Sequence, residues 1–127
     1  MNTRVVAAVI EERDRFFLTR RQRGVHLEGM WEFPGGKVNL DETNGDALRR
    51  EIWEELGADI VVHQLLLETT HAYPDRTITL FFYRCEFAGT PYPRLGQEMR
   101  WVERGGLLGI GLPPADAELV KLLTNGC

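Results

Sequence analysis

The chain has 127 residues, of which 43% are hydrophobic and 27% charged, so it holds enough apolar material for one domain over residues 1–127. Its 19 acidic and 15 basic side chains give a net charge of −4, which argues against direct binding of nucleic acid through bulk charge. No apolar run reaches the length of a membrane span, so we expect no membrane partner.

The N-terminus and the cysteines bear on where the protein works. One basic residue, Arg4, precedes a short apolar run without a signal-peptide cleavage pattern, so we expect a cytoplasmic protein. Cys85 and Cys127 are far apart and belong to no zinc or disulfide framework. We expect Cys85 to be buried and Cys127 to be exposed. The sequence leaves monomer and homodimer open.

The first part of the chain has the pattern of strands joined by turns. Residues 4–10 predict a strand, residues 11–14 a polar turn, and residues 16–20 a partner strand. Residues 24–29 have the composition of a loop. Pro34-Gly35-Gly36 predicts a tight turn, because proline and glycine favour chain reversal.

Residues 43–56 give the clearest helix prediction. Thr43 is placed to cap the first turn, with Asp46 as the answering acid of a capping box, and Gly57 stands where helices commonly end. An apolar stripe at i, i+4 and i+8 predicts the buried face of this helix. The stripe consists of Leu48, Ile52 and Leu56.

The second part of the chain predicts a long hairpin and a closing helix. Residues 59–70 and 77–87 are rich in β-branched, aliphatic and aromatic side chains, and Tyr73-Pro74-Asp75-Arg76 between them predicts a turn. Residues 99–103 predict a short strand, and residues 115–124 an amphipathic helix. This mixture predicts an α/β or α+β layered domain with a mixed sheet.

Three glutamates of the predicted helix point to a cation site. Glu51, Glu54 and Glu55 stand at i, i+3 and i+4, so their carboxylates project from one helix face and repel one another. A hard divalent cation such as Mg²⁺ would offset this repulsion, because it binds carboxylate oxygens and keeps water ligands for substrate phosphates. Glutamate is also common on solvated helices, so these three residues alone leave both interpretations open.

The segment from Gly36 to Ala58 matches the pattern G-x5-E-x7-R-E-U-x-E-E-x-G-U, in which U is a small or aliphatic residue. Seven positions of this pattern require one residue type, so a chance match in this chain is on the order of one in a million. The matching residues are Gly36, Glu42, Arg50, Glu51, Ile52, Glu54, Glu55, Gly57 and Ala58.

This pattern is the Nudix box, and the chain resembles Nudix hydrolases of the MutT type. The likeness continues outside the box, at Thr19-Arg20-Arg21, residues 31–37, Pro74-Asp75-Arg76, Gly96-Gln97 and Pro113-Pro114-Ala115. The resemblance implies an α/β/α sandwich with a mixed sheet. It also implies Mg²⁺-dependent hydrolysis of a nucleoside triphosphate to the monophosphate and pyrophosphate, with Mn²⁺ as an alternative cation.

The resemblance assigns roles to individual residues. The cation ligands would be Glu51, Glu54, Glu55 and the carbonyl of Gly35, with Glu51 as the candidate base. Glu42 and Arg50 would orient the box, and contact of Arg50 with phosphate is the alternative. The implied substrate-binding residues are Arg21, Glu32, Phe33, Lys37, Asp75, Arg76 and Asp116. A plain surface charge is the competing interpretation for Arg21, and a plain turn for Asp75 and Arg76.

Two positions depart from the MutT pattern. Leu95 stands where related chains carry a glutamate that binds an additional cation, and Glu98 is the candidate substitute. Asp116 stands where the 8-oxoguanine-specific enzyme has asparagine, and an ionised aspartate can only accept hydrogen bonds. Asp116 could therefore contact a guanine or a cytosine edge, or simply favour a helix N-terminus.

The preferred substrate on these grounds is 8-oxo-dGTP, which would make the protein a nucleotide-pool sanitising enzyme linked to DNA repair. A pyrimidine triphosphate such as CTP or dCTP is the first alternative, and ADP-ribose is disfavoured by the length of the chain. A non-catalytic Nudix-like nucleotide-binding module is the alternative of another class, but such modules generally lose box glutamates. His26, His63 and His71 form no spaced pair and are expected on the surface or in loops.

Overall fold

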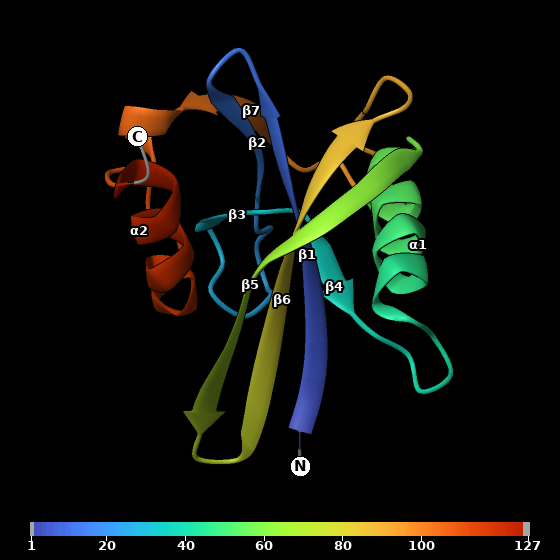
Figure 1. Cartoon of the computed structure of the whole chain (residues 1–127), viewed down its shortest axis with the longest axis vertical. Coiled ribbons are helices and arrows are strands. Elements are labelled where there is room, and N and C mark those ends of the chain that lie inside the picture. Colours follow the sequence, from blue (N-terminus) through green and yellow to red (C-terminus); the bar gives the residue numbers. More distant parts are fainter. Residues whose placement is uncertain (1, 126–127) are drawn as a thin grey trace.

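The computed structural model describes residues 2–125, in which a seven-stranded mixed sheet lies between two helices (Figure 1). The strands are β1 (Asn2–Glu12), β2 (Arg15–Arg20), β3 (Trp31–Glu32), β4 (Gly35–Lys37), β5 (Ile60–Tyr73), β6 (Arg76–Phe87) and β7 (Met99–Glu103). The helices are α1 (Asn44–Leu56) and α2 (Ala117–Asn125), with short 3₁₀ helices η1 (Arg104–Gly106) and η2 (Pro114–Asp116). The predicted α/β/α architecture is confirmed.

Most predicted elements are present at nearly the predicted positions. The closing helix differs, because its first turn is the 3₁₀ helix η2 and the α-helix begins only at Ala117. Pro113 and Pro114 precede this turn and cannot donate backbone hydrogen bonds, which sets where the helix starts. Cys85 is buried as predicted, whereas Cys127 lies outside the described residues. No helix among residues 2–125 is long and apolar enough to cross a membrane.

The sheet opens between β1 and β2. These strands form the predicted hairpin, but they pair only next to the turn, at Glu11 with Phe16 and Glu12 with Arg15. Beyond this point β2 pairs with β3 and β7, while β1 pairs in parallel with β6 and antiparallel with β4. Residues from β1 and β4, together with Arg21 just after β2, line a cleft.

Two hydrophobic cores cover the two faces of the sheet, because successive side chains of a strand point to opposite faces. Ala7 and Val9 of β1 belong to the core that includes Leu119 of α2. Val6, Ala8 and Ile10 belong to the core under α1. The predicted stripe of α1 lies in this second core and is completely buried. Helix α1 is therefore packed against the sheet along its whole length.

Both ends of α1 are capped at the predicted residues, but among residues 2–125 the Thr43 backbone N–H donates no hydrogen bond to the Asp46 carboxylate, so the capping box is not completed. The side-chain oxygen of Thr43 accepts a hydrogen bond from the backbone N–H of Asp46 at 3.1 Å. The carboxylate of Asp46 accepts from Arg49 at 2.8 Å, so this acid pairs along the helix surface. At the other end, Gly57 adopts a left-handed conformation with φ of 60°, and its N–H donates to Trp53.

The predicted tight turn at Pro34-Gly35-Gly36 is wrong for the two glycines. The chain bends at Pro34, but Gly35 and Gly36 lie in β4 and pair with Ala7 and Val6 of β1. A Cβ atom on Gly35 would overlap the backbone of Val6, and one on Gly36 would overlap the Glu51 carboxylate. These two positions need glycine because of close contacts, and not because the chain reverses there. Gly35 lies against backbone, and Gly36 lies against a carboxylate.

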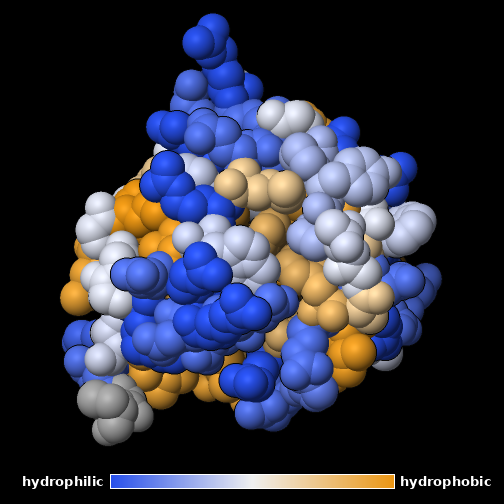
Figure 2. All heavy atoms as spheres, turned by 90° about the horizontal axis from the view of Figure 1, so that it is seen from above, coloured by the Kyte–Doolittle hydropathy of each residue, from blue (hydrophilic) through white to orange (hydrophobic). Residues whose placement is uncertain are grey.

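The surface carries no single dominant apolar face in the view from above. Figure 2 shows hydrophobic residues in separate patches between hydrophilic ones on that side of the molecule.

Gly35→Ala is expected to destabilise the fold by about 1–3 kcal/mol or more, because the new methyl group would overlap the backbone of β1. Gly109→Ala is the matched control, since a Cβ atom at Gly109 meets no atom within 4 Å. Urea denaturation of both variants measures the difference. Equal stabilities of the two variants would show that β4 does not need glycine at position 35.

Candidate active site

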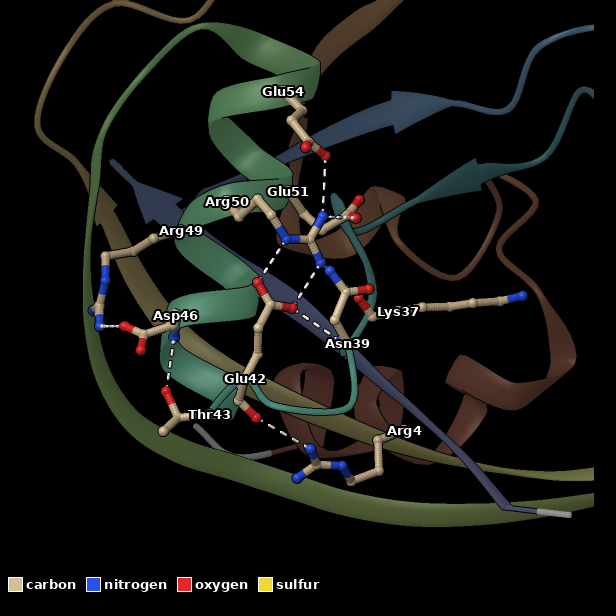
Figure 3. Close-up of polar contacts among 10 residues, drawn as sticks. All are labelled: Arg4, Lys37, Asn39, Glu42, Thr43, Asp46, Arg49, Arg50, Glu51 and Glu54. Atoms are coloured by element: carbon tan, nitrogen blue, oxygen red, sulfur yellow. Dashed lines mark hydrogen bonds and ion pairs between the residues drawn. The ribbon is translucent and has the colours of Figure 1, made fainter.

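Arg50 is the centre of a hydrogen-bond network on α1 (Figure 3). Its Nε and Nη2 atoms donate to the two carboxylate oxygens of Glu42 at 2.7 and 2.9 Å. Its Nη1 atom donates to Glu51 at 2.8 Å and to Glu54 at 3.0 Å. A single guanidinium therefore joins the loop before the helix to two of the helix glutamates.

Glu42 fixes the conformation of the loop that leads into α1. Its carboxylate also accepts from the backbone N–H of Asn39 at 2.9 Å, and Arg50 donates to the Lys37 carbonyl at 3.0 Å. The hydrogen bonds from Arg50 and Asn39 lower the pKa of Glu42 to about 2, so this carboxylate is ionised at any pH at which the protein works. Through these hydrogen bonds Glu42 and Arg50 hold the loop against α1.

A second arginine holds the same loop and was not singled out from the sequence. Arg4 of β1 donates to the backbone carbonyl of Glu42 and to the side chain of Asn44, both at 3.2 Å. Asn44 in turn donates to the hydroxyl of Tyr83 at 3.1 Å. These contacts cross about forty residues of sequence, so no local pattern indicates them.

Glu55 differs from the other two glutamates because it accepts no hydrogen bond from Arg50. Burial in the first place, together with the neighbouring Glu51, Glu32 and Glu54, raises the pKa of Glu55 to about 9. A half-buried carboxyl beside other carboxylates is the kind of oxygen-rich environment that a hard divalent cation neutralises. The residues present therefore fit a divalent cation.

The side chains of the three glutamates do not converge on one point as a complete set of metal ligands would. Among residues 2–125, no group of three acidic, histidine or cysteine side chains is close enough to hold a metal ion as it stands. Glu51 and Glu54 both accept hydrogen bonds from Arg50, which directs their carboxylates toward the guanidinium. A cation would have to compete with Arg50 for these oxygens.

A cleft of about 580 Å³ lies beside this network, between β1, β4, the β5–β6 hairpin and η2. All seven residues predicted to bind substrate line this cleft, although they come from five separate segments of the chain. They are Arg21, Glu32, Phe33, Lys37, Asp75, Arg76 and Asp116. Gly35 lines both this cleft and a smaller pocket that contains Glu55.

The basic residues of the cleft have different environments. Arg21 donates to the Glu32 carboxylate at 2.8 Å and to the carbonyl of His26, so its guanidinium is already held in place. Lys37 and Arg76 make no side-chain hydrogen bond or ion pair with the residues that the structure describes. Figure 3 shows the Lys37 side chain extending away from Arg50. Lys37 and Arg76 are therefore available to contact an anionic ligand.

Two acids line this cleft, the buried Asp116 and the half-buried Glu32, and Arg21 pairs with Glu32. Asp116 is only 7% exposed, and burial raises its pKa to about 7, with a further contribution from the charge of Glu32. Burial also raises the pKa of Glu32, against the lowering effect of Arg21. Arg21 pairs with Glu32 and not with Asp116. Ionisation of Asp116 is therefore opposed by burial without a positive partner to offset it.

Sequence reasoning missed several residues that line the cleft. His26 and Leu27 come from the loop after β2, and His71 and Tyr73 come from β5. The sequence predicted the histidines on the surface or in loops, and it did not indicate that two of them, His26 and His71, border the cleft. The apolar floor consists of Ile78, Leu80 and Phe82. Its alternating spacing on β6 was a usable signal, since residues two apart in a strand share a face.

The smaller pocket, of about 160 Å³, contains the position that departs from the family pattern. Leu95 and Gln97 line it together with Glu55. Glu98 lies elsewhere: its carboxylate pairs with Arg20 at 2.9 Å, and its side chain is 59% exposed. The structure thus does not bring Glu98 to the helix glutamates, because its backbone carbonyl is fixed to the N–H of Arg20 on β2.

Comparison with known proteins identifies what this arrangement resembles. A family model described as the NUDIX domain matches residues 5–122. An 8-oxo-dGTP diphosphatase of Haemophilus influenzae is 40% identical over 95% of this chain and 90% of its own length. A CTP pyrophosphohydrolase of Escherichia coli is 35% identical over 92% of this chain and 87% of its own length. The MutT structures from Aliivibrio salmonicida and Vibrio cholerae include one with a TM-score of 0.81 and 28% identity, covering 97% of this chain and 96% of that one.

Asp116→Asn is expected to stabilise the protein at pH 8 and to have little effect at pH 4. The carboxyl of Asp116 has an ordinary pKa of 3.8 when unfolded and about 7 when folded, so the folded state loses stability as pH rises through that window. Asparagine stays neutral throughout. The gain at pH 8 should exceed about 1 kcal/mol, since one pKa unit corresponds to about 1.4 kcal/mol.

Urea denaturation at both pH values measures this effect. Asp41→Asn is the control, because Asp41 is exposed and the substitution should change stability alike at pH 4 and pH 8. A pH-independent difference for Asp116→Asn would contradict a buried carboxyl that titrates near neutrality.

Proposed function

The chain belongs to the Nudix family of hydrolases, which act on phosphoric anhydrides, and we propose that it hydrolyses a nucleoside triphosphate to the monophosphate and pyrophosphate. The observation that carries the proposal is the position of the cleft. Its charged and apolar lining meets the glutamate face of α1 at Gly35, so a nucleoside held in the cleft would direct its phosphates toward Glu55.

Nudix hydrolases generally need a divalent metal ion, and we propose Mg²⁺ for this chain, with Mn²⁺ as a substitute. The residues that would hold it are Glu51, Glu54, Glu55 and the Gly35 carbonyl. A bound divalent cation supplies charge neutralisation for phosphate oxygens and lowers the pKa of a bound water. Glu51 is our candidate for the base that takes the proton of the attacking water, because it lies between Arg50 and Glu55.

The phosphates need local positive charge, since the whole chain carries a net charge of −4. Lys37 and Arg76 border the cleft and are not engaged in ion pairs with other described residues. We assign phosphate contact to these two side chains. Arg21 has a different role in this proposal, because it orders the loop that contains His26 and holds Glu32 in the cleft.

We propose 8-oxo-dGTP as the preferred substrate, in keeping with the relative from Haemophilus influenzae. Asp116 supports a purine with both donors and acceptors on its edge. Its pKa of about 7 means that the neutral form, with one O–H donor and one acceptor, is well populated at neutral pH. The neutral acid thus offers the same pair of functions as the asparagine of the 8-oxoguanine-specific enzyme.

CTP or dCTP remains the alternative substrate, and the Escherichia coli CTP pyrophosphohydrolase is the relative that favours it. The ionised form of Asp116 would accept from a cytosine amino group. A non-catalytic binding module is disfavoured because every box glutamate is present. Removal of oxidised nucleotides from the cytoplasmic pool would be the biological role of the preferred activity.

Pyrophosphate release with Mg²⁺ from 8-oxo-dGTP, dGTP, dATP, CTP, dCTP and ADP-ribose tests the function. We expect 8-oxo-dGTP to exceed each other substrate in kcat/KM by at least about tenfold, because one mispaired buried polar group costs about 1–3 kcal/mol. Higher activity on a cytosine nucleotide would reassign the base and leave the reaction unchanged. No turnover of any nucleotide would favour the binding-module alternative.

Glu55→Gln is expected to lower kcat by about 10²-fold or more, because it removes a carboxylate from the site without changing its size. Glu12→Gln is the matched control, since Glu12 is exposed near the β1–β2 turn and should retain full activity. Circular dichroism checks that both variants are folded. Full activity of Glu55→Gln would exclude this carboxylate from the reaction.

A further inference from the structure

The last turn of α1 is held by residues 92–97, which lie outside the Nudix box. A helix leaves its final carbonyl groups without partners inside the helix. Here the N–H of Tyr92 donates to the Leu56 carbonyl at 2.9 Å, and the N–H of Arg94 donates to the Glu55 carbonyl at 3.1 Å. This segment therefore acts as an external cap on the helix that carries the glutamates.

Gln97 makes the most specific contact in this cap. Its side chain is buried, with the residue only 7% exposed, and its Nε2 atom donates to the Glu55 carbonyl at 3.0 Å. Its Oε1 atom accepts from the N–H of Leu95, also at 3.0 Å. One amide thus joins the backbone of Glu55 to the backbone of Leu95, and these two residues line the same small pocket.

Arg94 adds a positive charge that α1 itself lacks at this end. The last turn of α1 contains no basic residue, whereas helix C-termini favour cations. The Arg94 guanidinium donates to the Trp53 carbonyl at 3.0 Å and lies 5.8 Å from the centre of the Trp53 ring. Arg94 therefore supports the same turn from the solvent side while Gln97 supports it from the buried side.

We infer that Gln97 is a positioning residue that sets the affinity of the glutamate face for a divalent cation, with Arg94 as its weaker counterpart. The inference rests on the proposed cation site. A side chain follows its backbone, so a rotation of the last turn would carry the Glu55 carboxylate away from Glu51. Functional groups must be held within about half an ångström of their working geometry, and a hydrogen bond at the residue's own carbonyl is a direct restraint.

The departure at Leu95 increases the importance of this restraint. An apolar side chain at that position supplies no oxygen to a cation, so the site depends more heavily on the exact orientation of Glu55. Gln97 joins Leu95 and Glu55, and Gln22, which also lines the pocket, donates to the Leu95 carbonyl at 2.7 Å. The backbone at Leu95 is thus held on both its N–H and its carbonyl, although its side chain is not the usual carboxylate.

Gln97→Met tests the inference, because methionine has a similar size and no charge but makes neither hydrogen bond. Titration with Mn²⁺, followed by the electron paramagnetic resonance signal of the free ion without nucleotide, should show a dissociation constant raised at least tenfold. In the pyrophosphate assay kcat should fall about tenfold, with the KM for nucleotide changed less than twofold. Arg94→Met, which keeps packing over Trp53, should raise the dissociation constant about threefold.

Gln64→Met is the matched control, since Gln64 is exposed on β5 and its replacement should leave Mn²⁺ binding unchanged. If Gln97→Met destabilises the protein but folded samples of it and of Arg94→Met bind Mn²⁺ with wild-type affinity, Gln97 is merely structural and the inference is wrong. Absence of nucleotide hydrolysis by the wild type would contradict the proposed function alone, because the Mn²⁺ titration requires no turnover.

Discussion

The fork of hydrogen bonds from Arg50 to Glu42 is the constraint on which the site depends. The same guanidinium contacts Glu51 and Glu54, so one positive charge organises three carboxylates, and Glu55 adds a fourth beside them. The single positive charge of Arg50 therefore does not neutralise all of these carboxyl groups. The network holds the glutamates in place. Because it neutralises only part of their negative charge, the remaining carboxylate oxygens can still bind a divalent cation.

Rigidity of α1 makes that balance possible. One side of the helix is completely buried against the sheet, and both ends are fixed by contacts from other parts of the chain. Arg4 reaches the loop before the helix, and residues 92–97 bind its last carbonyls. Repulsion among the glutamates alone would weaken the helix. Packing and capping offset this repulsion, so the glutamates lie on a helix that is held at both ends.

Local signals explain which parts of this arrangement the sequence predicts. The stripe from Leu48 to Leu56, the cap at Thr43 and the turn before β6 each depend on neighbouring residues, and each is confirmed. The divergence of β1 and β2 depends on which distant strands pair, and no local pattern encodes it. Gly35 illustrates the difference. The local sequence Pro34-Gly35-Gly36 suggests a turn, but position 35 needs glycine because the backbone of β1, about thirty residues earlier, leaves no room for a side chain.

Asp116 shows how its surroundings change what one residue type can offer. An ionised aspartate only accepts hydrogen bonds, whereas the protonated acid also has one O–H donor and so comes closer to an asparagine amide, which has two N–H donors and an acceptor oxygen. In this cleft burial, with the charge of Glu32 as a smaller cause, raises the pKa of Asp116 to about 7, while Glu32 itself pairs with Arg21. The environment, rather than the residue type, then decides whether Asp116 offers a hydrogen-bond donor to a ligand in the cleft. An expectation made from residue identity alone would miss this, because burial in the folded protein shifts the protonation equilibrium of this carboxyl.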